Sequence, residues 1–290
     1  MAELDLPLAP ASHDVEGPRA PRNAYEWLVA IDLDGTTIDE VGHASPAVRA
    51  ELHRVASAGH HLLVATGRSA ATTLGVFDHI EIWPEYVVCS NGAMVLVRDE
   101  TAARGYRRLR TRGFDAAAVL ETIRQHLPTA HLAVEDEQGS YRYSHPFPPM
   151  TTEPAHVQTI VAHDALIVGK AVRVVAIVPE ADVDEFRHQV AQMDLLGVTF
   201  SLGWTAWLDI AAEGVTKASA VEEIRAALGF RRDRVMAVGD GYNDVEMIAW
   251  AAEEGRGVAM GHAPQPLITV ASEVTGSLSE DGLAQALASL

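Results

Sequence analysis

The sequence predicts an α/β fold in which a core built on a parallel sheet is split by an inserted α+β segment. Short apolar runs alternate with helical patterns in the first third of the chain and again in the last third, which is typical of parallel βαβ units. Between these stretches the runs pair as hairpins, which favours an α+β arrangement. We expect a core formed by residues 25–93 and 207–290, and an inserted cap domain formed by residues 94–206.

The first strand is expected at Leu28–Ile31, a buried apolar run too short for a helix, which stops before Gly35. Ser45 and Pro46 are typical of a helix start, and Gly59 of its end. The other expected core elements are strands at 61–65, 86–89, 207–210, 235–238 and 257–260, and helices from Ser69 and at 217–228, 244–252 and 282–290. The elements expected in the insertion are a hairpin of 94–97 with 106–109, helices at 114–126 and 182–193, and strands near Leu132, near Tyr141 and at 172–178.

Composition limits the classes of partner and the compartment. The 290 residues carry a net charge of -18, which disfavours binding to nucleic acid or to an anionic membrane surface. The arginine-rich run 104–112 could face a phosphorylated ligand, but its alternation with Tyr106 and Leu109 favours a solvated strand face. Cys89 is the single cysteine, which excludes an intramolecular disulfide and suits a reducing cytoplasm. Residues 1–24 lack the pattern of a signal peptide, so we expect a flexible tail.

Two carboxylates lie where the first strand ends. Asp32 and Asp34 are two residues apart, so extended geometry would turn both side chains to one face. A hard cation such as Mg²⁺, which binds one or two carboxylates with waters and phosphate oxygens, would relieve their repulsion. Asp32 could then attack phosphorus to form an aspartyl-phosphate. Asp34 could protonate the leaving oxygen and later deprotonate water. The alternative is a turn in which the aspartates and Gly35 serve only backbone geometry.

Two more polar signals belong to the same expected edge of the sheet, because ligands bind at the carboxyl ends of parallel strands. Thr66-Gly67 ends the second strand, where a hydroxyl and an open backbone N–H can donate to phosphate oxygens. Lys217 begins a helix, where acids are normally preferred, and its ammonium could pair with Asp32 and with phosphoryl oxygens. The alternatives are an ordinary turn and a solvated surface lysine.

A second acidic motif, Gly239-Asp240-Gly241-Tyr242-Asn243-Asp244, lies between an expected strand and an expected helix. Asp240 could complete a Mg²⁺ site, with Asp244 supporting it or acting as an additional ligand. Asn243 could donate its side-chain amide to phosphate. Capping of the following helix is an alternative role for Asn243 and Asp244.

In order and spacing these motifs resemble the haloacid dehalogenase-like hydrolase superfamily, in particular its Cof-type branch, which has a large cap between its second and third motifs. The resemblance spans about residues 26–290 and rests on Asp32-Leu33-Asp34-Gly35-Thr36, Thr66-Gly67-Arg68, Asn91-Gly92-Ala93, Lys217 and the 239–244 motif. Two positions depart from the family pattern. Ala218 follows the lysine where glycine is frequent, and His262 stands where asparagine is frequent.

The resemblance implies a Mg²⁺-dependent phosphatase with a Rossmann-like, doubly wound core and a mobile cap. It implies that Asp32 is the nucleophile and Asp34 the acid/base, and that Thr66 and Lys217 hold the phosphoryl group. The implied metal ligands are the Asp32 carboxylate, the Asp34 backbone carbonyl and Asp240, with Asp244 beside them. The implied phosphate cradle is the backbone of Leu33 and Gly67 with the Asn243 side chain.

We expect the substrate to be a small phosphorylated metabolite such as a sugar phosphate, with no nucleic acid or membrane partner. Two alternatives remain open from the sequence: a phosphomutase of the same superfamily, and a catalytically silent protein that binds a phosphorylated ligand. In such an architecture the cap contacts the rest of the substrate, and Tyr141, His145 and Arg173 are among the candidates for that role.

Overall fold

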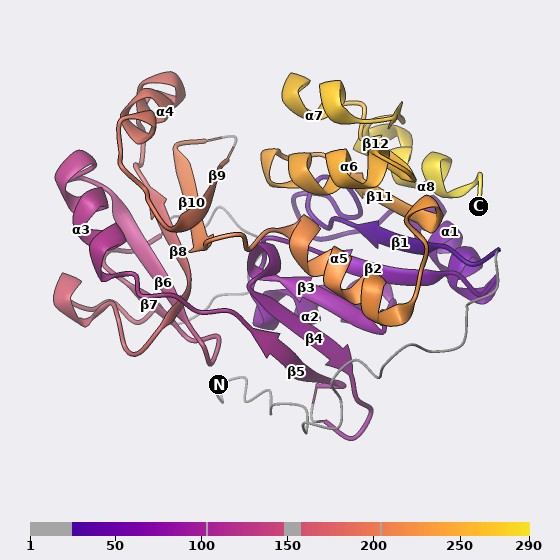
Figure 1. The fold of residues 1–290 in the computed structure, drawn as a ribbon, viewed down its shortest axis with the longest axis horizontal. Coiled ribbons are helices and arrows are strands. Elements are labelled where there is room, and N and C mark those ends of the chain that lie inside the picture. Colours follow the sequence, from indigo (N-terminus) through magenta and orange to yellow (C-terminus); the bar gives the residue numbers. More distant parts are fainter. Residues whose placement is uncertain (1–24, 103, 148–157, 204) are drawn as a thin grey trace. The chain divides into compact units, whose positions relative to one another are not determined.

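The computed structural model describes residues 25–102, 104–147, 158–203 and 205–290. Its chain divides into two compact units (Figure 1). One unit is a continuous segment, Thr111–Val215, and the other, the core unit, combines the described residues up to Arg110 with Thr216–Leu290. The expected tail at 1–24 and part of the proline-rich loop after His145 lie outside the described residues. Within the described ranges, no helix combines the length and apolar composition needed to cross a bilayer.

The core unit is built on an eight-stranded sheet (Figure 1). In spatial order its strands are β13 (Glu273–Val274), β12 (Arg256–Ala259), β11 (Val235–Gly239), β1 (Leu28–Ile31), β2 (His61–Ala65), β3 (Tyr86–Cys89), β4 (Met94–Arg98) and β5 (Tyr106–Thr111). The pairs from β13 to β3 are parallel, and β3 pairs with β4 antiparallel. Because the chain proceeds from β1 to one side and later adds β11 and β12 on the other, the carboxyl end of β1 is a topological switch point, where ligands bind.

Helices flank this sheet as expected for strands that are apolar on both faces. The helices of the core unit are α1 (Pro46–Ser57), α2 (Ala70–Ile80), α5 (Lys217–Leu228), α6 (Val245–Ala252), α7 (Gln265–Val270) and α8 (Gly282–Leu287). Leu28 and Ala30 of β1 share one hydrophobic cluster with α5, α6 and α7. The predicted helix start at Ser45 is confirmed, since its side chain accepts a hydrogen bond from the Val48 N–H.

In its described residues the second unit is an antiparallel sheet with the α-helices α3 (Ala117–His126) and α4 (Val183–Ala191). Its strand order is β7 (Tyr141–Tyr143), β6 (His131–Asp136), β8 (Ala171–Ile177), β10 (Trp207–Ala212) and β9 (Val198–Leu202). The helices α3 and α4 pack on the same sheet face, in a cluster that includes Ile123, Phe186 and Leu208. This confirms the expected α+β character of the insertion.

Two predicted elements belong to the other sheet. The hairpin β4–β5, expected in the insertion, extends the core sheet from β3, and β10, expected to reopen the core, pairs antiparallel with β8 and β9. The structure therefore divides the chain after Arg110 and Val215, whereas the sequence placed the boundaries after residues 93 and 206. An apolar run predicts a strand, but the sheet that it joins is decided by its long-range partners. Strand β9 was not predicted.

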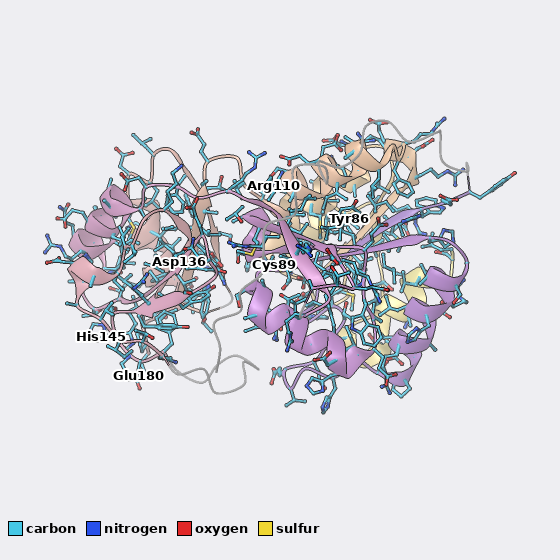
Figure 2. All side chains as sticks on the ribbon, turned by 90° about the horizontal axis from the view of Figure 1, so that it is seen from below. Tyr86, Cys89, Arg110, Asp136, His145 and Glu180 are labelled. Atoms are coloured by element: carbon cyan, nitrogen blue, oxygen red, sulfur yellow. The ribbon has the colours of Figure 1, made fainter. Side chains whose placement is uncertain are left out.

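Figure 2 shows the side chains on this framework, with Tyr86 and Cys89 in the core unit and Asp136 and His145 in the second unit. The Cys89 side chain is buried and forms no disulfide. Its sulfur lies 3.7 Å from the Thr73 Oγ1 of helix α2. The imidazole of His145 stacks on that of His131, with ring centroids 4.7 Å apart.

Candidate active site

The loop after β1 brings the first two aspartates out of the sheet in a fixed conformation. The Asp32 N–H still donates to the Val238 carbonyl of β11, at 3.0 Å, so the strand pairing reaches the first carboxylate. The Leu33 carbonyl then accepts from three successive backbone N–H groups, of Thr36, Thr37 and Ile38. This tight turn ends the strand where the sequence predicted.

The loop is anchored from inside as well. The Thr37 hydroxyl donates to the Asp32 carbonyl at 2.6 Å, and the Thr36 hydroxyl donates to Oδ1 of Asp240 at 3.1 Å. Both threonines are buried. The two acidic motifs, more than two hundred residues apart in the chain, are therefore joined by a direct side-chain hydrogen bond.

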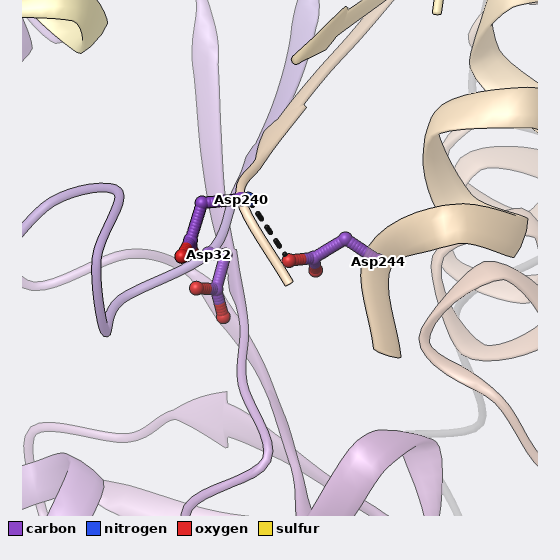
Figure 3. A group of neighbouring side chains, drawn as sticks. All are labelled: Asp32, Asp240 and Asp244. Carbon is purple, nitrogen blue, oxygen red and sulfur yellow. Dashed lines mark hydrogen bonds between the residues drawn. The ribbon is translucent and has the colours of Figure 1, made fainter. Parts of the chain in front are cut away.

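Three buried carboxylates meet at this end of the sheet. Asp32, Asp240 and Asp244 each offer an oxygen atom, and these atoms lie within 4.8 Å of one another (Figure 3). Asp32 is 5% exposed and Asp244 is fully buried. Asp240 follows β11 and Asp244 ends the short 3₁₀ turn Tyr242–Asp244 just before α6, so neighbouring strands of the sheet set the spacing of the cluster.

Lys217, the first residue of α5, supplies a positive charge to this cluster. Its Nζ donates to Asp32 Oδ1 at 2.6 Å and to Asp244 Oδ1 at 2.8 Å, and the residue is 1% exposed. The alternative of a solvated surface lysine is excluded. The predicted pairing of Lys217 with Asp32 is present, and the bond to Asp244 is an addition that the sequence did not indicate.

Asp244 holds the acidic loop together. Its Oδ2 accepts from the backbone N–H groups of Asp240, at 3.1 Å, and of Gly241, at 2.9 Å, and the first of these bonds is drawn in Figure 3. Its other oxygen accepts from Lys217. With both oxygens engaged, Asp244 is suited to orienting Lys217 and Asp240.

Burial and mutual charge shift the pKa values of the carboxylates and the lysine of this cluster. Burial raises the pKa of Asp32 well above its ordinary value, Lys217 acts against this rise, and Asp244, Asp240 and Asp34 add to it. Burial likewise raises the pKa of Asp244, again against the effect of Lys217. Burial disfavours the charge on Lys217, but the carboxylates of Asp244 and Asp32 more than compensate, so its pKa is raised.

The donor set fits a divalent cation. When ionised, three carboxylates facing one ammonium leave two negative charges unbalanced in a buried site. Buried charges are tolerated when they are paired or when they coordinate a metal. Oxygen ligands of this kind suit hard cations such as Mg²⁺.

His262, at one of the two positions that depart from the family pattern, places its Nε2 3.5 Å from Oδ2 of Asp240.

Three of the residues predicted to hold phosphate, Thr66, Gly67 and Asn243, follow β2 and β11. The backbone of Thr66 is fixed by its N–H, which donates to Val88 O at 2.9 Å, and by its carbonyl, which accepts from Asn91 N at 3.1 Å. The Asn243 amide donates to Asn91 Oδ1 at 3.0 Å. A Cβ on Gly67 would lie 3.1 Å from that Asn91 oxygen. The structure therefore gathers Thr66, Gly67 and Asn243 around Asn91, for which the sequence offered a motif but no role.

An ion pair at the edge of the cluster was not predicted. Arg68, quoted only as part of a motif, forms two hydrogen bonds to the Asp34 carboxylate. The signal available in the sequence was its position, because an arginine directly before a helix N-terminus is electrostatically disfavoured, as it is for Lys217.

Fold and site together define an α/β enzyme whose acidic residues meet at the switch point of a parallel sheet. A model of the haloacid dehalogenase-like hydrolase family matches residues 29–287, and the chain belongs to this family. The predicted Cof-type membership and phosphatase class are confirmed by its relatives.

Two curated relatives illustrate the similarity. The 5-amino-6-(5-phospho-D-ribitylamino)uracil phosphatase YitU of Bacillus subtilis is 26% identical over 268 residues, which span 90% of this chain and 96% of that protein. The pyridoxal phosphate phosphatase YbhA of Escherichia coli is 26% identical over 278 residues, spanning 89% and 96%. Among solved structures, the subclass IIB sugar phosphatase BT4131 superposes with a TM-score of 0.75 at 19% identity, covering 91% of this chain and 98% of that one.

Proposed function

We propose that the protein is a Mg²⁺-dependent phosphatase that hydrolyses a small phosphomonoester through an aspartyl-phosphate on Asp32. The observation that carries the proposal is the buried pairing of Asp32 with Lys217, 2.6 Å apart, at the switch point of the sheet. An ammonium at that position stabilises an anionic nucleophile beside an anionic substrate. The relatives support the substrate class, since the substrates for which they are named are phosphorylated small molecules of different kinds.

In the first step an oxygen of the Asp32 carboxylate attacks phosphorus. The new O–P bond forms as the bond from phosphorus to the leaving oxygen breaks, and the electron pair of that bond stays on the leaving oxygen. The Asp34 carboxyl gives its proton to this oxygen, so that a neutral alcohol departs. In the second step water attacks the phosphorus of the aspartyl-phosphate, Asp34 takes a proton from the water, and Asp32 departs as a carboxylate with inorganic phosphate as product.

The remaining residues orient the phosphoryl group. We propose that the Lys217 ammonium, the Thr66 hydroxyl and the Asn243 amide donate to its oxygens, together with the backbone N–H groups of Leu33 and Gly67. Asp32, the Asp34 backbone carbonyl and Asp240 would hold Mg²⁺, with Asp244 fixing Asp240 and Lys217 from behind. The bound ion supplies positive charge that balances the carboxylates and the phosphoryl oxygens.

The test is release of inorganic phosphate from a panel of sugar, alkyl, aryl and pyridoxal phosphates. We expect release that requires Mg²⁺, stops on addition of EDTA and falls at least about a thousandfold in Asp32→Asn. Asp194→Asn, an exposed aspartate of the second unit, is the matched control and should retain full activity. Turnover by Asp32→Asn at the parent rate would refute the nucleophile. Isomerised sugar phosphate in place of free phosphate would identify a mutase.

A further inference from the structure

A bidentate ion pair between Arg68 and Asp34 joins the loop after β2 to the loop after β1. Arg68 Nε donates to Asp34 Oδ2 at 2.7 Å, and Arg68 Nη2 donates to Asp34 Oδ1 at 2.5 Å. The side chain of Arg68 is 9% exposed, whereas that of Asp34 is 53% exposed. The guanidinium is therefore enclosed by the protein, and the carboxylate that it holds is open to an incoming molecule.

The backbone of Arg68 is fixed on two sides. Its N–H donates to Thr66 Oγ1 at 3.1 Å, and its carbonyl accepts from the Ser90 N–H at 2.8 Å. Arg68 precedes Ser69, the N-cap of α2. The positive end of a helix dipole disfavours a cation there, so local helix energetics do not explain the arginine. The Asp34 carboxylate does explain it.

The pair differs from the surface ion pairs of the same chain. Arg124–Glu121 and Arg231–Asp233 join residues three and two positions apart, and both arginines are largely exposed. Exposed pairs of this kind contribute little. Arg68 and Asp34 are separated by 34 residues, belong to the core unit, and meet through a planar fork that fixes the direction of both carboxylate oxygens.

We propose that Arg68 is a positioning residue that holds the Asp34 carboxyl in the orientation required for proton transfer to the leaving-group oxygen. This inference rests on the proposed function. The two hydrogen bonds from the Arg68 guanidinium occupy one lone pair on each Asp34 oxygen, and a carboxylate has about four lone pairs that can accept. The lone pairs on the side away from Arg68 stay available for proton transfer to the leaving oxygen and later from water. Without the fork, the half-exposed Asp34 side chain would rotate freely and seldom be aligned.

The inference makes a prediction that depends on the leaving group. An alkoxide needs a proton as it departs, whereas p-nitrophenolate is a stable anion and needs none. The ratio kcat/KM reports the steps up to departure of the alcohol, so the later role of Asp34 as a base does not enter. We expect Arg68→Ala to lose about a hundredfold in kcat/KM for an alkyl phosphate. For p-nitrophenyl phosphate the expected loss is within about threefold, because acid assistance contributes little there.

The experiment compares p-nitrophenyl phosphate with the alkyl phosphomonoester that the panel shows to be hydrolysed best. The variants are Arg68→Ala, Arg68→Lys and, as the benchmark for lost acid catalysis, Asp34→Asn. Arg107→Ala is the matched control, since Arg107 also binds an aspartate, Asp99, within the core unit. Arg68→Lys keeps the charge without the fork and should remain impaired for the alkyl ester. Added guanidinium should partly restore Arg68→Ala.

The outcomes separate the inference from the proposed function. Selective loss for the alkyl ester, parallel to that of Asp34→Asn, supports the positioning role. Equal loss for both esters would assign Arg68 to phosphate binding or to folding, and no loss for either ester would show that Arg68 has no role in the reaction. Each of these results overturns the inference, while turnover by the wild-type protein would still support the proposed phosphatase function. A wild-type protein that hydrolyses neither ester would remove both. If Arg68→Ala does not fold, Arg68→Lys decides by the same ratio.

Discussion

Gly35 shows how one residue without a side chain determines the geometry of the acidic cluster. Its φ of +76° lies in the left-handed region. A Cβ at this position would lie 2.4 Å from Oδ2 of Asp240, well inside van der Waals contact. The loops after β1 and β11 approach this closely only because position 35 has no side chain.

We predict that Gly35→Ala weakens metal binding more than it weakens the fold. The matched control is Gly42→Ala, because Gly42 has a φ of +84° but nothing within 4 Å of an added Cβ. Both substitutions incur backbone strain of about 1–2 kcal/mol. Only Gly35→Ala should displace Asp240 and raise the half-saturating Mg²⁺ concentration, by about tenfold or more. Titrating Mg²⁺ in phosphate release and in thermal unfolding measures this, and equal titrations for the two variants would contradict it.

At the residue scale, the sequence predicts side chains that share a strand end but not pairs that depend on loop geometry. Asp32, Thr66, Lys217 and Asp240 were proposed as site residues because each follows a strand or begins a helix of the core. The Arg68–Asp34 pair was not found, because two loops 34 residues apart must fold before the two side chains meet.

At the scale of elements, the start of helix α5 determines where the Lys217 ammonium lies. Thr216 is the N-cap, and its side chain accepts from Ser219 N at 3.1 Å while Ser219 Oγ accepts from Thr216 N at 3.0 Å. The loop after β3 packs against this cap, since a Cβ on Gly92 would lie 2.2 Å from the Thr216 carbonyl oxygen. Two reciprocal bonds therefore fix the first turn of the helix that carries the lysine.

We expect Thr216→Ala to lower the free energy of unfolding by about 1 kcal/mol, because the first turn of α5 loses a side-chain acceptor. Thr216→Ser keeps the hydroxyl and is the control, with stability close to that of the parent. Urea denaturation of both variants and the parent provides the measurement. Identical midpoints for Thr216→Ala and Thr216→Ser would show that the cap contributes nothing.

Element types were predictable in both units, whereas membership of a sheet was not always so. The strand at Trp207–Ala212 was recognised from its apolar run, but it pairs antiparallel with β8 and β9. Its Leu208 and Ile210 pack beneath α3 and α4 in the second unit. The apolar pattern of a strand depends on adjacent residues in the sequence, whereas the pairing of this strand depends on residues distant in the sequence. The boundary expected after residue 206 therefore differs from the division after Val215.

At the scale of the whole molecule, the folded core unit buries carboxylates whose burial lowers the stability of the fold. Burial raises the pKa of both Asp32 and Asp244, so ionising either carboxylate is harder in the folded than in the unfolded chain. A group with a raised folded-state pKa contributes its full stability below its unfolded pKa, near 4, and loses it as the pH rises toward the folded value. A bound cation reverses this penalty.

We predict that Asp32→Asn, measured in EDTA, gains stability relative to the parent as the pH rises from about 4 to 7. Because the pKa of Asp32 is higher in the folded chain, the unfolded parent releases this proton at a lower pH than the folded parent does, and the variant has no proton to release at this position. Chemical denaturation at both pH values measures the difference. Repeating it in saturating Mg²⁺ should turn the advantage back to the parent, and a difference that is independent of pH would contradict the raised pKa.

The division after Arg110 and Val215 also has a consequence for how such a gene can change. Asp32, Arg68, Lys217 and Asp240 all belong to the core unit, whereas Thr111–Val215 is one continuous segment of the chain. Substitutions, insertions or recombination within that segment do not change the spacing of the acidic cluster, because strands of the core unit set that spacing. Selection on the chemistry and selection on the inserted unit therefore act on separate segments of the gene, and the two can diverge at different rates.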